Sequence, residues 1–538
     1  MVQRLLPRLK ARYRREAPLE AGGFTSGDQS TSSRSGVQSE RSQLAKASSW
    51  PMELETPLSE GLDFYLEYHK TDLSFHHYFF KHDANHFLHE ILIEHAHHYE
   101  PLLYAVAGFA AFHQTVRRSR TGRIRHFLEY YNKSVSLLRL SLKNGEPHTD
   151  ATILTILQLA TFEEYLGDWV SLLSHQQAAF RMLSELYTPQ SIVTDELHQR
   201  ILAWYLRFDL TGSIMSGYET AAGRDWFQAL ADCYHAQSSA DPESTDKKIE
   251  AAVADHRLMC TDMAMLFSRY SKHEMSPEEF EEQGRAFSTY LDTWYDRLDP
   301  VFRDERYQVT CFEGRVKESG DIVDPFKPGG LYRGPLETFN FMIADNVAMQ
   351  AMFAHKRALA LSECPPPNLP EYALELCRIF ETIEFSPEIP PEAILKVHAS
   401  LGVACLFLPK EDTHILWCRK KLAKIEASGY IYPATFRRQM ASLWNLPEIN
   451  HWWLPNEEAY PPVVRSVRLL LEDRLGDIDP QQRSKKQRDM RGVFADMSIQ
   501  DDKDAQAGKL QMGPDMGHAA DLDMLKEDRR DLATGQWK

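Results

Sequence analysis

The amino-acid sequence predicts an all-α fold: one large, bundle-like multi-helix domain with disordered N- and C-terminal tails. Apolar residues recur at helical spacing from residue 58 to residue 446, and no set of alternating strand segments appears. Residues 192–217 are apolar on two nearly opposite arcs of a helical projection. Because a helix with two apolar faces is packed inside a larger helical body, we expect this segment to be the central helix.

The expected central helix combines a wide apolar surface with one acid inside it. Thr194 or Asp195 is expected to cap its N-terminus. One arc carries Leu197, Ile201, Trp204, Tyr205, Phe208 and Met215, and the other carries Leu202, Leu206, Leu210 and Ile214. A solvated stripe is expected at Arg200, Arg207 and Thr211. Asp209 lies between the arcs, where a carboxylate needs a hydrogen bond or a charged partner.

Further helices are expected on both sides of the central one. Before it lie 58–70, 84–98, 101–116, 121–143, 149–165 and 168–187; after it lie 246–272, 276–297, 337–362, 370–384, 390–408, 411–428, 433–446 and 462–478. Residues 101–113 are apolar all round, and Gly108 would let a neighbouring helix approach closely. The segment 298–336 is punctuated by Pro and Gly and is expected to be an ordered excursion or loop.

Length and charge limit the class of protein. The chain has 538 residues, of which 43% are hydrophobic, enough for a large folded domain with tails. Its formal net charge of −16 disfavours nucleic acid as a partner of the whole chain, although a local basic patch is compatible with one. No apolar run reaches the length of a membrane span, and no secretory signal opens the sequence.

The cysteines indicate reduced thiols rather than a zinc site or a disulfide framework. They are Cys233, Cys260, Cys311, Cys364, Cys377, Cys405 and Cys418. No two of them have C-x2-C spacing, and scattered cysteines in helical segments are typical of an intracellular protein.

Composition divides the chain into three expected parts. These are a disordered basic and polar leader at 1–54, the helical domain at 55–460, and a short helix with a polar tail at 461–538. The leader is rich in Arg up to Glu16 and in Ser, Gly, Gln and Thr after it. A solvated tail, a nuclear-import or phosphate-binding arm and a transit peptide all fit it. The basic run Gln482–Arg491 suits a solvated helix end or a weak import signal.

Histidines gather near the start of the helical region. They are His76, His77, His82, His86, His89, His95, His97 and His98. Glu94 and His97 have the Glu-x-x-His spacing of di-iron bundles, but the other such pair, Glu411 and His414, sits at a helix start and bridging carboxylates are not evident. We therefore predict no metal site and expect a partly exposed structural segment, with pH sensing as the alternative.

Other motifs offer little support for an enzyme. The phosphate-loop, dinucleotide-binding and G-x-S-x-G patterns are absent. The arginine run Val116–Arg125 suits a helix C-terminus, with an anion contact as the alternative. A terpene-synthase-like enzyme would need acidic clusters that hold magnesium, yet DDKD (501–504) lies in the tail, and Glu163 with Glu164 is expected to be a surface pair. We predict no catalytic residue, metal ligand or cofactor.

Four stretches carry a resemblance to a known family. They are HAHHYEPLLYAVAGFAAFH (95–113), FLEYYNKSVSLLRLSL (127–142), AWYLRFDLTGSIMSG (203–217) and SLGVACLFLPKEDTHILWCRKKLAKIEASGYIYPATFRRQMASLW (400–444). In order and spacing they resemble the fungal-specific transcription factor domain, the regulatory region of Zn(II)2Cys6 proteins. The third stretch resembles the family's W-x4-D-x3-S core, with Trp204, Asp209 and Ser213 in the matching places.

The resemblance implies a helical regulatory domain in the nucleus and a structural role for its signature. Trp204 would be a packing anchor, Asp209 a buried hydrogen-bond acceptor, and Ser213 the third signature position. Family members usually carry an N-terminal six-cysteine cluster that places a helix in the DNA major groove. This sequence has no cysteine before Cys233, so direct DNA binding is not expected from it. Loss of the cluster and a truncated gene model both account for this departure.

The predicted function is that of a transcription regulator without its own zinc cluster, and not that of an enzyme. Protein partners, a homodimer and a small-molecule effector held between apolar helices are the expected modes of action. Two alternatives stay open: a helical, metal-dependent enzyme such as a terpene-synthase-like protein, and a scaffold that does not bind DNA.

Overall fold

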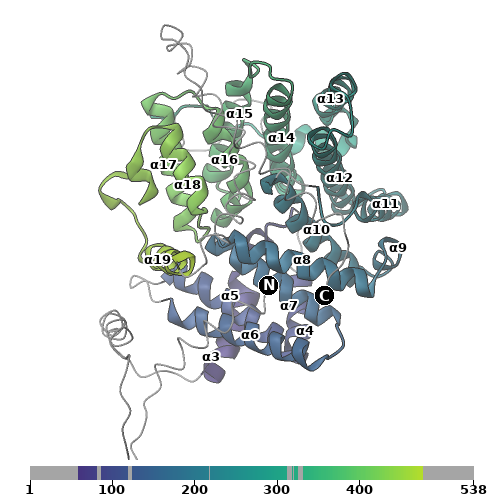
Figure 1. The fold of residues 1–538 in the computed structure, drawn as a ribbon, viewed down its shortest axis with the longest axis vertical. Helices are drawn as coiled ribbons and strands as arrows, with labels where there is room; N and C mark the ends of the chain where they lie inside the picture. Colours follow the sequence, from purple (N-terminus) through teal and green to yellow (C-terminus); the bar gives the residue numbers. More distant parts are fainter. Residues whose placement is uncertain are drawn as a thin grey trace, which may run out of the picture.

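The structure is a computed structural model in which helices make up nearly all of the regular elements (Figure 1). It describes residues 58–81, 86–118, 124–216, 219–311, 318, 320–324 and 331–476. The prediction of an all-α fold is therefore confirmed. The expected leader and most of the expected C-terminal tail lie outside the described residues.

The N-terminal helices occupy the lower part of Figure 1. They are α3 (Leu58–Asp72), the 3-10 turn η1 (Phe75–Tyr78), the π-helical turn η2 (Phe87–Ile91), α4 (Leu92–His98), α5 (Glu100–Arg118), α6 (Arg125–Asn144), α7 (Asp150–Leu166), α8 (Trp169–Leu186), α9 (Pro189–Ile192) and α10 (Glu196–Ser216). We refer to α3–α10 as the N-terminal half.

Most of the later helices lie in the upper part of the same view, whereas α19 lies lower, at about the height of α8. They are α11 (Arg224–Ala240), α12 (Thr245–Ser271), α13 (Pro277–Asp292), α14 (Phe339–Ala360), α15 (Leu369–Phe385), the 3-10 segment η7 (Pro391–Val397), α16 (His398–Phe407), α17 (Asp412–Ala427), α18 (Ala434–Leu443) and α19 (Pro462–Gly476). We refer to α14–α19 as the C-terminal half.

The segment between α13 and α14 is an excursion with little regular structure. It contains four 3-10 turns, η3 (Tyr295–Arg297), η4 (Pro300–Arg303), η5 (Glu305–Tyr307) and η6 (Gly334–Leu336), and further 3-10 turns, η8 (Pro447–Asn450) and η9 (Pro455–Glu457), precede α19. A short antiparallel ladder pairs β1 (Gln308–Val309) with β2 (Leu331–Tyr332). The expectation of an ordered excursion is confirmed for its described residues.

Local sequence sets where the central helices begin and end. At the start of α7, Thr149 and Thr152 form a capping box, and Gly167 ends the helix in the left-handed conformation. Asp168 then accepts a hydrogen bond from Ser171 N and caps α8. Helix α10 begins at Glu196, and Asp195 caps it by accepting a hydrogen bond from His198 N, which confirms one of the two expected N-caps; residues 189–192 form the separate short helix α9.

Three helices form the centre of the N-terminal half. Helix α5 is buried along most of its length, as predicted, and a Cβ at Gly108 would lie 3.2 Å from Tyr131 N of α6. This confirms that Gly108 lets α6 approach closely. Helix α7 is buried on all sides from Thr152 to Leu166, and α10 packs against both α7 and α8.

One sequence-based expectation missed an entire element. Helix α11 was not predicted, yet it packs closely against α12 and buries Trp226, Phe227 and Leu230. Its apolar residues Trp226, Phe227, Leu230 and Tyr234 recur at helical spacing, so the periodic signal was present in the sequence.

The apolar core is continuous between the two halves. The main hydrophobic cluster includes residues of α3 to α10 and of α14 to α19, so neither half has a core of its own. A second cluster lies around α12, α13, residues Phe339 to Phe353 of α14 and the excursion, with Phe339 stacked on Trp294 and Phe302. The predicted division into domains at residues 55 and 461 stays a prediction.

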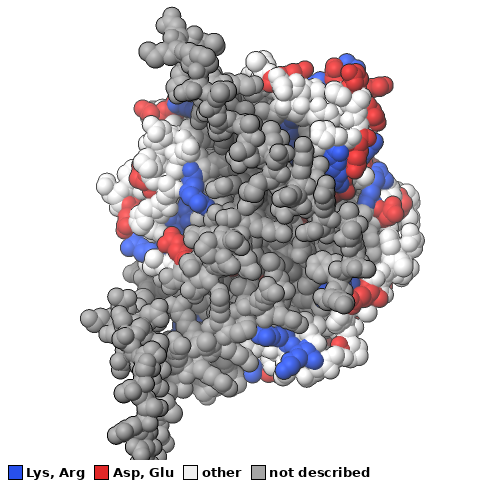
Figure 2. Space-filling model, in the orientation of Figure 1, with Lys and Arg blue, Asp and Glu red and all other residues white. Residues whose placement is uncertain are grey.

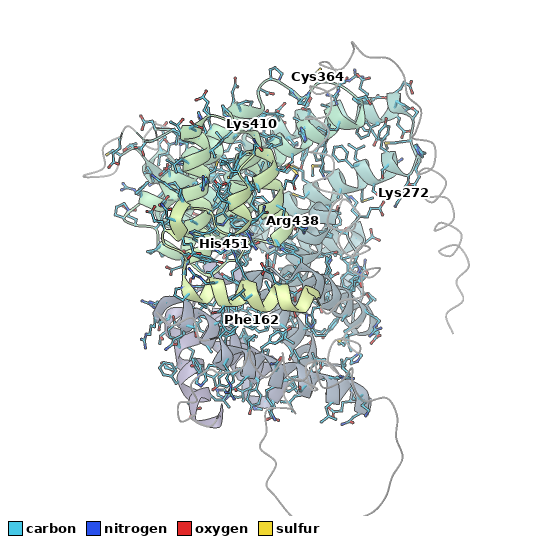
Figure 3. The ribbon with its side chains drawn as sticks, turned by 60° about the vertical axis from the view of Figure 1, so that its left-hand side comes forward. Phe162, Lys272, Cys364, Lys410, Arg438 and His451 are labelled. Atoms are coloured by element: carbon cyan, nitrogen blue, oxygen red, sulfur yellow. The ribbon has the colours of Figure 1, made fainter. Side chains whose placement is uncertain are left out.

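Helix α19 lies across the boundary between the two halves (Figure 3). Val463, Val464 and Val467 lie in the main cluster. Arg468 is buried and forms an ion pair with Glu426 of α17. The helix expected at 462–478 is therefore part of the folded core.

The end of α7 provides a direct test of how the halves fit together. Gly167 has a φ of +73°, and a Cβ there would lie 2.6 Å from Ile431 O. Gly145 has a φ of +69° with nothing within 4 Å, so it is a matched control. We expect Gly145→Ala to cost about 1 kcal/mol from backbone strain alone. Gly167→Ala should cost roughly 1–3 kcal/mol more because the Ile431 segment must move.

Urea denaturation of the two variants measures this difference. Equal losses of unfolding free energy would show that the Ile431 segment does not pack against α7 as described.

Candidate functional site

The signature residues of α10 lie inside the protein. Trp204 is fully buried, and its Nε1 donates a hydrogen bond to Thr161 Oγ1 of α7 at 3.2 Å. The rings of Tyr78, Phe80 and Phe87 surround it edge-on. Trp204 therefore joins α10 to α7 and to the segment that follows α3.

Asp209 holds the chain that follows α10. Its carboxylate accepts hydrogen bonds from Gln176 Nε2 at 2.7 Å, from Ala221 N at 2.8 Å and from Ala222 N at 2.7 Å. Burial raises the pKa of Asp209 to about 6, while these three hydrogen bonds oppose the rise. Gly212 leaves room for Gln176, since a Cβ there would lie 2.8 Å from Gln176 Oε1. Ser213 is also buried.

The expected solvated stripe on α10 is wrong. Arg207 donates two parallel hydrogen bonds to Glu164, at 3.0 Å to Oε1 and 2.8 Å to Oε2, and only 1% of the Glu164 side chain is exposed. Arg200 forms an ion pair with the buried Glu250 of α12. A helical projection cannot find these partners, because they come from segments distant in the sequence.

The expected surface pair Glu163 and Glu164 is wrong for the same reason. Glu163 Oε2 accepts a hydrogen bond from His175 Nδ1 at 2.6 Å, and Glu163 Oε1 accepts one from Tyr131. Burial raises the pKa of Glu163. Burial by itself would lower the pKa of His175, but the neighbouring Glu163 carboxylate outweighs it and raises the pKa of His175. The two acids interrupt an apolar run of α7 that is otherwise typical of a fully buried helix, and this was the available signal.

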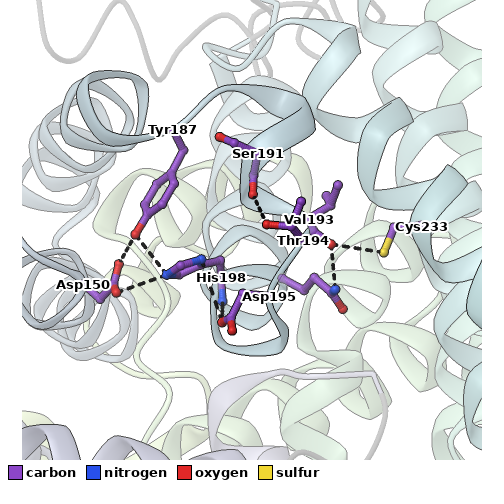
Figure 4. A network of polar contacts seen from close by, with 9 residues as sticks. Asp150, Tyr187, Ser191, Val193, Thr194, Asp195, His198 and Cys233 are labelled. Atoms are coloured by element: carbon purple, nitrogen blue, oxygen red, sulfur yellow. Dashed lines mark hydrogen bonds and ion pairs between the residues drawn. The ribbon is translucent and has the colours of Figure 1, made fainter.

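A further polar network joins the start of α10 to α7 and α8 (Figure 4). Tyr187 OH donates a hydrogen bond to Asp150 Oδ1 at 2.5 Å, and His198 Nε2 lies 3.2 Å from Asp150 Oδ2. Burial and the Asp150 carboxylate raise the pKa of Tyr187. The network is half-buried, and it positions the ends of three helices.

The histidine-rich segment is partly buried and partly exposed. His76 and His77 are buried, whereas His86, His97 and His98 are exposed, and His82 lies outside the described residues. Glu94 is exposed as well. In the part of the chain that the structure describes, no group of three or more His, Cys, Asp or Glu side chains could hold a metal ion.

The described surface carries charged side chains of both signs (Figure 2). On the face shown in Figure 2, basic and acidic side chains both occur around the margin. Arg117 of the expected arginine run forms an ion pair with Asp72, and Arg125 pairs with Glu129. None of the described helices is long and apolar enough to cross a membrane.

The buried polar groups of α7, α8 and α10 form a structural centre, meaning that their side chains bind one another. The buried carboxylates Glu163, Glu164 and Asp209 each accept hydrogen bonds from partners inside the protein. A group that is already satisfied in this way is not available to bind a substrate without losing those bonds.

Comparison with known proteins identifies the segment that contains this centre. Residues 64–315 match the fungal specific transcription factor domain. The resemblance predicted from the sequence is therefore confirmed over that stretch. No curated protein and no solved structure matches the chain.

The match includes three of the four resembling stretches, namely 95–113, 127–142 and 203–217. The fourth, 400–444, lies outside it, so the resemblance there stays a prediction. A fungal specific transcription factor domain indicates a transcription regulator rather than an enzyme. The signature role of Trp204, Asp209 and Ser213 also stays a prediction, to which their burial gives a physical basis.

Removing the Asp209 carboxylate tests its structural role. Asp209→Ala would leave the Ala221 and Ala222 amides without their acceptor, and Ala222 is fully buried. We expect a loss of roughly 1–3 kcal/mol in unfolding free energy. Asp63→Ala, at an exposed position of α3, is the control and should change stability by less than about 0.5 kcal/mol. A melting curve of Asp209→Ala that matches wild type would contradict this role.

The Arg207–Glu164 pair makes a second prediction. Arg207→Met leaves Glu164 as a buried charge without its partner and should cost roughly 3–5 kcal/mol. The double variant Glu164→Met/Arg207→Met removes both charges and should be more stable than Arg207→Met alone. The exposed pair Arg285–Glu281 is the control, and Arg285→Met should cost at most about 1 kcal/mol. Additive losses in a denaturant double-mutant cycle would show that the pair is not coupled.

Proposed function

We propose that the chain is a nuclear transcription regulator whose helical domain acts through contacts with other proteins. The match of residues 64–315 to the fungal specific transcription factor domain carries this proposal. Trp204, Asp209 and Ser213, the predicted signature residues, are buried, so in this proposal contacts with partners use other, solvent-facing residues.

The net charge supports protein contacts over direct DNA contacts. A formal charge of −16 repels the phosphate backbone at long range, and DNA-binding proteins rely on basic surfaces to offset that repulsion. In this proposal DNA is reached through a partner or through a segment outside the described residues.

Two modes of regulation are compatible with this proposal. A homodimer would be detected by light scattering at micromolar concentration, where a monomer mass would contradict it. A small-molecule effector would raise the melting temperature in a thermal-shift screen, since a ligand that binds only the folded state stabilises it.

A tethering experiment tests the proposed function. Residues 58–476 are fused to an unrelated DNA-binding domain, and a reporter downstream of its site is measured in fungal cells. We expect the fusion to change reporter output several-fold in either direction, and we expect the tagged full chain to accumulate in the nucleus. Asp63→Ala should behave like wild type, whereas Asp209→Ala should lose activity in proportion to its loss of folded protein.

An unchanged reporter with well-folded fusion protein, together with exclusion of the full chain from the nucleus, would contradict the proposal. A nuclear chain with no effect on the reporter would instead favour the scaffold.

A further inference from the structure

Residues 75–80, which we call the wedge, lie between the two halves of the protein. Tyr78 packs edge-on against Trp204 of α10 in the N-terminal half. Phe79 contacts Tyr165 of α7 on one side, at 5.1 Å between ring centroids, and His398 of α16 on the other, at 5.0 Å. The wedge therefore adds ring contacts between the halves to the direct contact of Ile431 with the end of α7.

The backbone of the wedge is held by this packing. Phe79 has a φ of +56°, in the left-handed region that a bulky residue adopts only when its surroundings enforce it. A segment in such a conformation relaxes when its packing is lost. We therefore expect the wedge to leave its position when the side chains that pack against it, which we call its seat, are destabilised.

Four buried histidines form that seat. His76 and His77 belong to the wedge, His69 lies on α3, and His113 lies on α5 with its ring 4.9 Å from that of His77. His69 Nε2 contacts Tyr78 OH at 2.6 Å, and Tyr78 OH donates to Gln158 Oε1 of α7 at 3.0 Å.

These rings are arranged for the neutral state. Since Tyr78 OH donates to Gln158, His69 Nε2 must donate to Tyr78, which leaves His69 Nδ1 without a proton. Within the seat, three buried ring nitrogens have no hydrogen-bond partner among the described residues: His69 Nδ1, His76 Nδ1 and His113 Nε2. A proton added to any of them would create a buried N–H without an acceptor.

The groups that face the four rings do not compensate a positive charge. Those with an electrostatic or ring contact are Lys70 and Asp72 of α3, His89 of η2, Arg117 of α5, Tyr165 of α7 and Lys396 of η7, besides the four histidines themselves. Asp72 is the one acid among them, and it is already paired with Arg117. The buried His175, by contrast, has Glu163 beside it.

Burial consequently lowers the pKa of every ring in the seat. The pKa of His69 falls to about 3, that of His76 to about 2 and that of His77 to about 4, and that of His113 falls well below its ordinary value. A histidine whose folded pKa lies below its unfolded value near 6.5 stabilises the folded state fully above that value. This stabilisation is lost as the pH falls toward the folded pKa.

We propose that the wedge is a proton-operated device: the neutral histidines seat it between the two halves, and acidification expels it. Expulsion of the wedge, which we call opening, is a property of the fold alone. The idea that opening controls contacts with partner proteins rests in addition on the proposed function. An experiment that measures opening therefore separates a failure of one from a failure of the other.

The device is expected to respond steeply to pH. The opening constant is the ratio of molecules with the wedge expelled to molecules with the wedge in place. Each histidine that reaches water on opening raises this constant by up to tenfold for each pH unit below about 6.5. Because His76 and His77 leave together, we expect the opening constant to rise by more than tenfold, and by up to ~100-fold, per pH unit between pH 6 and pH 5. A single exposed histidine could give no more than tenfold.

Hydrogen exchange followed by mass spectrometry on the full chain tests this expectation. Opening constants for peptides that cover residues 75–80 are measured from pH 7.5 to pH 5, after correction for the intrinsic pH dependence of amide exchange. Helices α12 and α13 do not contact the four histidines of the seat. As the pH falls, we therefore expect peptides from the wedge to lose protection at a higher pH than peptides from α12 and α13. A slope of tenfold per pH unit or less, or simultaneous loss of protection throughout the chain, would overturn the proposal.

Non-titrating variants assign the slope to the seat. His76→Phe/His113→Phe replaces two rings that have aromatic neighbours, and it should reduce the slope to tenfold per pH unit or less, the most that His77 alone can contribute. His86→Gln/His97→Gln, at two exposed positions, is the matched control and should leave the slope unchanged. An unchanged slope in the first variant, or an equal reduction in the control, would overturn the proposal. If His76→Phe/His113→Phe does not fold, the pH slope of the wild-type opening constant still tests the proposal, because a slope of tenfold per pH unit or less would overturn it.

Discussion

The ion pair between Arg207 and Glu164 sets the geometry on which the two halves depend. A charged pair withdrawn from water is favourable only when its geometry is good and its hydrogen bonds are satisfied. Two parallel N–H···O bonds meet that requirement here, and they fix both the rotation of α10 and the position of the end of α7. The end of α7 in turn receives the C-terminal half, where Ile431 N donates a hydrogen bond to Tyr165 O at 2.9 Å.

Buried ion pairs recur where other helices meet in the C-terminal half. Lys421 of α17 pairs with Glu381 and Glu384 of α15, and Glu426 pairs with Arg437 and with Arg468 of α19. Large apolar surfaces can pack in several alternative registers at similar free energy, whereas a displaced ion pair leaves a buried charge uncompensated. The pairs thus discriminate among packings that apolar contacts alone would not distinguish.

The sequence predicted those features that depend on neighbouring residues along one helix. Periodicity identified α5 and α10 as buried helices, and the small residue at 108 identified a close approach. The position of Asp209 required a partner, but the partners Gln176, Ala221 and Ala222 lie on other elements and were not identifiable. Arg207 was expected to face water because a projection of one helix contains no information about Glu164, which is 43 residues away.

In a regulator with this fold, the buried residues can contribute little to specificity for a partner. Substitutions at Trp204, Asp209 or Arg207 change buried contacts that hold α7, α8 and α10 together, so their first effect is on stability. Specificity for a partner must then come from solvent-facing side chains, or from a change in which side chains face solvent. Expulsion of the wedge would be a change of the second kind, because Tyr78, Phe79 and Phe80 are buried only while it stays in place. The same neutral histidines that complete the core at neutral pH would then determine when those aromatic rings become available.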